Sequence, residues 1–229
     1  MTSLFATFSL DTLDGIALAV LIVMWAATGW LAEHPPASRP SVSALMATYR
    51  RDWMRQFVTR SPRIFDANII DSLRQSTAFF ASTSMIAIGG GVALIGNITT
   101  LEGLAQDLTL EPAGVRVELK IILVLLFLAN ALLKFVWAHR LFGYCAILMA
   151  AVPNDAADPL AYPRADQAAE INITAAKSFN RGLQSIYFAL AAITWLLGPW
   201  SLIGATVVTC FVLLRREFAS LSRKVMLAR

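Results

Sequence analysis

A lysine inside an apolar stretch is the residue best placed to do chemistry. Lys134 interrupts the apolar segment 117–138, and Asn130 lies one helical turn before it. On a helix these two side chains share a face, where an ammonium and an amide could hold an anionic solute or a lipid headgroup. Lys134 could also pair with a carboxylate, for which the candidates are Glu33, Asp66, Asp71 and Glu217. The alternative is that its stem lies along apolar surface and its ammonium reaches the lipid headgroups.

A second group of charged residues follows Ser61-Pro62, which breaks a helical pattern. Asp66 can cap the next helix while Arg63 contacts lipid phosphates. In an alternative arrangement, Arg63 and Asp66 form an ion-paired cluster with Arg140 or Glu217 beneath the helices. Both arrangements make these residues candidates for a binding site.

The signatures of metal, cofactor and enzyme sites are missing from the sequence. His34 and His139 have no Cys, His or carboxylate three or four residues away, so we expect no metal or haem site. There is no phosphate-binding glycine loop, HExxH, CxxC or nucleophile elbow, which argues against an enzyme. Cys145 and Cys210 are expected at different depths, and we predict no disulfide between them.

The composition indicates an integral membrane protein built from helices. Hydrophobic residues make up 57% of the 229 residues and charged residues 15%, against about 25% charged in average soluble chains. We expect an all-α, polytopic transmembrane bundle forming a single membrane domain over 1–229. A helix needs about 20 residues to cross the hydrocarbon core, which predicts about five spans: 15–32, 77–98, 117–138, 182–197 and 200–215. The last two spans are short, and their Gly198-Pro199 turn could belong to a re-entrant hairpin.

Basic residues lie beside the apolar spans, which favours anionic lipid over nucleic acid as a partner. Apolar residues of 42–60 recur at helical spacing, so this segment is predicted to be an amphipathic helix at the membrane surface. Its predicted headgroup contacts are Arg50, Arg51, Trp53 and Arg55. The span 77–98 is rich in small residues, which let membrane helices pack closely and favour a homo-oligomer or a subunit of a larger complex.

The distribution of positive charge predicts an orientation. Sixteen of the 19 Lys and Arg residues lie on every second connection or in the C-terminal tail. Cytoplasmic loops carry an excess of Lys and Arg, so we expect an outward N-terminus and a cytoplasmic C-terminus. The first 14 residues contain no Lys or Arg, so the first span is read as retained rather than cleaved.

Three long stretches and the tail RREFAS resemble a known family. The stretches are RIFDANIIDSLRQSTAFFASTS, ELKIILVLLFLANALLKFVWAHRLFGYC and NITAAKSFNRGLQSIYFALAAITWLLGP. They look like the integral membrane proteins of domain-of-unknown-function family 599. The resemblance implies a multi-span protein, commonly bacterial and therefore of the inner membrane, and implies no activity. The positions that match the family pattern are Asp66, Phe79, Phe80, Lys134, Trp137, Arg140 and Asn172.

Three classes of function remain open from the sequence. The first is a non-enzymatic module that assembles with itself or a larger membrane complex and contacts anionic lipid. The second is a transporter or channel for a small anionic or amphipathic solute, with Lys134 and Asn130 facing a cavity. An enzyme acting on lipid is the third, and the missing motifs make it the weakest.

Overall fold

The computed structural model describes residues 11–96 and 117–228, and this part of the chain is all-α without strands. The elements, in chain order, are α1 (Thr12–Glu33), α2 (Val42–Thr59), α3 (Ile64–Gly96), α5 (Val117–Ala150), α6 (Ala161–Ile193), the 3-10 helix η1 (Thr194–Leu197), α7 (Pro199–Phe218) and α8 (Leu221–Leu227). The predicted acidic loop before the third span, the last two residues of the second span and the first ten residues of the chain lie outside the described residues. Each of the predicted spans and the segment 42–60 corresponds to a helix.

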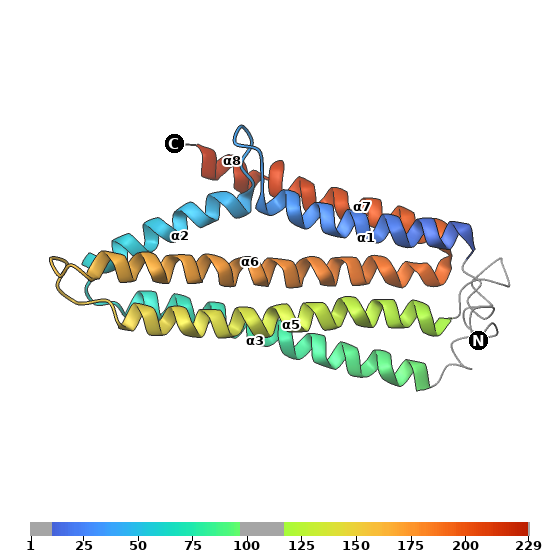
Figure 1. Cartoon of the computed structure of the whole chain (residues 1–229), viewed down its shortest axis with the longest axis horizontal. Helices are drawn as coiled ribbons and strands as arrows, with labels where there is room; N and C mark the ends of the chain where they lie inside the picture. The colour runs from blue at the N-terminus through green and yellow to red at the C-terminus, as the bar shows by residue number, and fades with distance from the viewer. Residues whose placement is uncertain (1–10, 97–116, 229) are drawn as a thin grey trace, which may run out of the picture.

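The helices run side by side along one long axis, with α6 at the centre (Figure 1). On one side of α6 lies α5, with α3 beyond it, and on the other side lie α1 and α7. The pair α1 and α7 accompanies only the second half of α6, while α2 packs along its first half. We call the half of the molecule that contains α2, the first turns of α3 and α6, and the last turns of α5 the polar half.

Three helices of the described chain are long and apolar enough to cross a membrane: α1, α3 and α5. They contain 22, 33 and 34 residues, against about 20 needed for the hydrocarbon core. α6 and α7 do not belong to this group. The first half of α6 is polar, and α7 ends in Arg215, Arg216 and Glu217. Whether these two helices cross therefore stays a prediction.

Helix boundaries differ from the sequence prediction in two places. The Pro- and Asp-rich stretch 153–163 predicts a loop followed by a helix that starts near Asp166. α6 instead begins at Ala161, because Pro163 falls in the first turn, where its missing N–H breaks no helical hydrogen bond. α8 was not predicted from the sequence. Its N-cap is Ser220, whose hydroxyl accepts a hydrogen bond from the Arg223 N–H.

α5 and α6 pack closely against each other along much of their length. A Cβ atom added at Gly182 would lie 2.6 Å from Cε1 of Phe135, so the glycine lets the ring pack directly on the α6 backbone. Phe135 is fully buried and also contacts the rings of Phe80 and Phe179, with centroids 5.4 Å away in both cases. This aromatic cluster joins α3, α5 and α6 at the border of the polar half.

Candidate functional site

The two residues singled out inside the third span do not share a site. Asn130 donates from Nδ2 to the Ser185 hydroxyl at 2.7 Å and thereby links α5 to α6. Lys134 is partly exposed and forms no hydrogen bond or ion pair with any residue that the structure describes. It lines neither of the two cavities described below. Two of its candidate partners are occupied, since Glu33 pairs with Arg181 and Asp66 with Arg60.

Asp66 and Arg63 lie close in sequence but have separate partners. The buried carboxylate of Asp66 accepts hydrogen bonds from Arg60 and from Trp53 Nε1, the latter at 2.6 Å. Arg63 instead donates to the backbone carbonyls of Val58, Val152 and Pro153. Arg140 is exposed and donates to the Tyr144 hydroxyl at 3.1 Å. These contacts hold α2, α3 and the loop after α5 together, and they do not form the ion-paired cluster considered from the sequence.

The exposed arginines of α2 form ion pairs with α6. Arg51 lies 2.7 Å from Glu170 and Arg55 lies 3.4 Å from Asp166. Both pairs are solvent-exposed and one turn apart on each helix, as expected for two antiparallel helices. Exposed pairs of this kind contribute about 0–1 kcal/mol each, so they align α2 rather than anchor it.

Arg50 differs from its neighbours because it points inward. Its Nη1 donates to Oδ1 of the fully buried Asn172, whose Nδ2 contacts Cys145 Sγ at 3.5 Å. Among the described residues, no carboxylate lies within ion-pair distance of this guanidinium. Burial lowers the pKa of Arg50. A half-buried cation is therefore left without a counter-ion in the described part of the chain.

Arg50 lines a partly open cavity of about 420 Å³ between α2, α3, α6 and α7, to which α5 adds Phe142 and α8 adds Ser222. Its charged wall contains Arg50, Lys177, Arg216 and Glu217. Its apolar wall contains Leu73, Phe142, Ile173, Phe179 and Leu183. The volume is within the range of about 300–1,000 Å³ typical of small-molecule sites. A cavity with a cationic side and an apolar side suits an anionic amphiphile.

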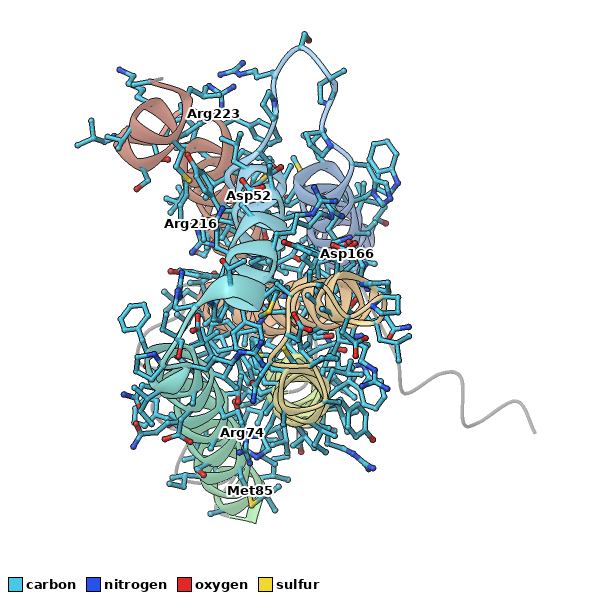
Figure 2. All side chains as sticks on the ribbon, turned by 90° about the vertical axis from the view of Figure 1, so that its left-hand side faces the viewer. Asp52, Arg74, Met85, Asp166, Arg216 and Arg223 are labelled. Carbon is cyan, nitrogen blue, oxygen red and sulfur yellow. The ribbon has the colours of Figure 1, made fainter. Side chains whose placement is uncertain are left out.

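A smaller cavity of about 130 Å³ adjoins the first and shares Ser43, Lys177, Asn180, Arg216 and Glu217 with it. Glu217 is buried, and its Oε2 accepts hydrogen bonds from the backbone and hydroxyl of Ser43, both at 3.0 Å. Arg216 Nη2 lies 4.0 Å from the other carboxylate oxygen. Figure 2, which views the molecule from the polar half, shows Arg216 projecting beside α2. The small cavity then continues between α1 and α6 as far as Thr28 and Gln184.

From the sequence, Arg50 was predicted to contact headgroups at the membrane surface. Lys177 was counted only among the positive charges that predict the orientation. One signal was available for α6. Ile173, Lys177 and Asn180 recur at helical spacing and form one face, and all three line the larger cavity. The partners of this face come from α2 and α7, which no local pattern brings together.

His34, His139, Cys145 and Cys210 line neither cavity. His34 stacks on Trp30, with centroids 5.4 Å apart, and His139 Nδ1 lies 3.2 Å from the Thr77 hydroxyl. Cys145 and Cys210 are free and buried. Within the described residues, no group of three His, Cys, Asp or Glu side chains could hold a metal ion.

The fold defines an all-α membrane protein whose polar half encloses a partly cationic cavity. Residues 16–222 match the family described as "Protein of unknown function, DUF599", and the chain belongs to this family. The match confirms the resemblance seen in the sequence. No curated protein and no solved structure matches the chain.

Proposed function

We propose that the protein is a non-enzymatic membrane module that binds the anionic headgroup of an amphiphile in the larger cavity. The observation that carries the proposal is the half-buried guanidinium of Arg50, which lines this cavity and has no carboxylate partner among the described residues. Removing a cation from water without a counter-ion costs free energy, and an anion bound in the cavity would offset that cost. The apolar side chains that line the same cavity support an amphiphile over a fully water-soluble anion.

The depth of the cavity supports a lipid source for the ligand. In the proposed topology, α1, α3, α5, α6 and α7 cross the inner membrane of a bacterium, with the C-terminus in the cytoplasm. The predicted spans end at residues 32, 138 and 215 and begin at 77 and 182. The cavity is lined by residues next to these limits, among them Ser76, Phe142 and Arg216. This is the depth of the cytoplasmic headgroups, which are richest in anionic lipid.

Self-assembly, or packing within a larger complex, is the second part of the proposal. Of the apolar window of α3, only 6% of the residues are buried inside the protein, compared with 28% for α5. Met85, on this helix, lies at its outer edge, away from α6 (Figure 2). The exposed stretch contains Gly89 and Gly90, where an added Cβ would meet nothing within 4 Å. A neighbouring membrane helix could therefore pack closely there.

The transport alternative uses Lys134 as the anion ligand. Its position outside both cavities gives it less support than Arg50 has. The headgroup-binding and transport proposals predict opposite effects of Arg50→Met and Lys134→Met on ligand retention, so one experiment tests both.

Native mass spectrometry of the protein released from nanodiscs containing anionic and zwitterionic lipids tests the proposal. We expect wild type to retain anionic lipid and Arg50→Met to lose at least about 90% of it, since a charge-assisted contact is worth about 1.5–3 kcal/mol. Arg55→Met is the matched control, because Arg55 is on the same helix and lines neither cavity. Retention that survives Arg50→Met and disappears in Lys134→Met would instead support the transport reading. The same spectra report the oligomeric state.

A further inference from the structure

The charged residues that line the larger cavity indicate how much negative charge the ligand carries, and not only that the ligand is an anion. Resting on the proposed function, we infer that the bound head is a phosphate monoester, which carries up to two negative charges, rather than a phosphate diester, which carries one. The inference depends on which of the cavity's charged groups are already paired.

One cation of the cavity is balanced by the protein itself. Arg216 lies 4.0 Å from Glu217, and both belong to the last turns of α7. Arg216 also lies over the ring of Tyr187, with its guanidinium carbon 5.7 Å from the centroid. The positive charge of Arg216 and the negative charge of Glu217 therefore largely offset each other.

The other two cations have no such balance. Arg50 contacts the neutral side chain of Asn172, and Lys177 makes no hydrogen bond or ion pair within the described part of the chain. They come from different helices, α2 and α6, and line the same cavity. Two uncompensated positive charges are best matched by a ligand with two negative charges.

The donors available also favour a monoester. A monoester offers three strong acceptor oxygens and a charge of about −1.5 to −2 at neutral pH. Arg50 uses one N–H for Asn172, which leaves most of its guanidinium fork for the ligand. Lys177 adds three donors on a flexible stem. A diester has one charged phosphate group with two free oxygens and would leave part of this donor set unused.

The ester can come from a lipid or from a soluble metabolite, and the surroundings favour the lipid. Phe142, Phe179 and Leu183 line the same cavity as Lys177. An alkyl chain attached to the phosphate can cover these side chains, and the burial of each CH₂ group strengthens binding. We therefore expect a phosphatidate-type head whose first chain carbons lie against this wall.

The test compares three ligands by calorimetry on the intact protein in a nonionic detergent. They are short-chain phosphatidic acid, phosphatidylglycerol with the same chains, and glycerol 3-phosphate. We expect phosphatidic acid to bind about tenfold or more tightly than phosphatidylglycerol, with glycerol 3-phosphate weakest. Lys177→Gln should reduce the preference for phosphatidic acid to about twofold or less, because it removes one of the two unpaired charges.

Lys177 is exposed, so its replacement should leave the fold intact, and Lys224→Gln is the control on α8 outside both cavities. Equal affinity for the two lipids would overturn the monoester inference and leave the proposed function standing. No binding of either lipid would overturn both. Glycerol 3-phosphate binding as tightly as phosphatidic acid would overturn the lipid source while supporting the monoester chemistry.

Discussion

At the scale of single residues, two charged groups of the polar half differ in how the protein pairs them: the fully buried Asp66 and the half-buried Arg50. Asp66 accepts hydrogen bonds from Arg60 and Trp53 inside the protein, so its charge is compensated by the fold. Among the described residues, Arg50 donates to the amide oxygen of Asn172 and pairs with no carboxylate. A compensated charge serves stability, whereas an uncompensated one beside a cavity is a group that a ligand can complete.

This difference predicts that Asp66 matters for folding. Asp66→Asn removes the charge that attracts Arg60, and we expect a loss of about 2 kcal/mol in the free energy of unfolding. A thermal melt in detergent measures the effect as a lower melting temperature. Asp71→Asn, one turn further along α3 and exposed, is the control and should change little. Equal melting temperatures for the two variants would show that the Asp66 contacts do not stabilise the protein.

At the scale of helices, the sequence was sufficient to predict most elements. Apolar runs and helical spacing placed α1, α2 and α7 to within three residues at each end, because local pattern determines these boundaries. The predicted start of α6 lies five residues too late because Pro163 was assigned to the preceding loop, whereas it occupies the first turn of the helix. The η1 turn and α8 were missed, since four and seven residues are too short to show a period.

The contact between α5 and α6 leads to a prediction about the stability of the protein. Gly182→Ala would place a methyl group 2.6 Å from the buried ring of Phe135, so we expect a destabilisation of about 1–3 kcal/mol from overpacking. Gly143→Ala on α5 is the matched control, because an added Cβ there meets nothing within 4 Å. Alanine should leave this site unchanged or stabilise it by up to about 1 kcal/mol. Chemical denaturation of both variants measures the two effects, and a Gly182→Ala protein as stable as wild type would contradict the packing.

At the scale of the whole molecule, the cavity could not be predicted from local patterns. Its lining comes from six helices, α2, α3, α5, α6, α7 and α8, and α2 reaches it by packing along the first half of α6. The sequence showed that Arg50 lies on a basic helix, but it could not show that this one arginine faces Asn172 while Arg51 and Arg55 face solvent. Lys134 was singled out because its apolar neighbours are visible in the sequence. That it does not line the cavity is visible only in the structure.

The orientation of the molecule is a further prediction. In a variant without native cysteines, we expect a membrane-impermeant maleimide added to intact cells to label Thr12→Cys and Trp200→Cys but not Ser222→Cys. Trp200 is 71% exposed at the turn between α6 and α7, so it reports whether these helices cross completely. Labelling after cell lysis controls for the reactivity of each site. Labelling of Ser222→Cys in intact cells would reverse the orientation, and protection of Trp200→Cys alone would indicate a re-entrant hairpin.

The central claim is that an anionic head occupies the cavity between α2 and α6. The most direct measurement is a crystal structure of the protein grown from a lipidic mesophase doped with phosphatidic acid. We expect phosphate density in the cavity, in contact with the guanidinium of Arg50 and the ammonium of Lys177. A cavity filled only by water, with Arg50 paired to a carboxylate of the protein, would contradict the claim.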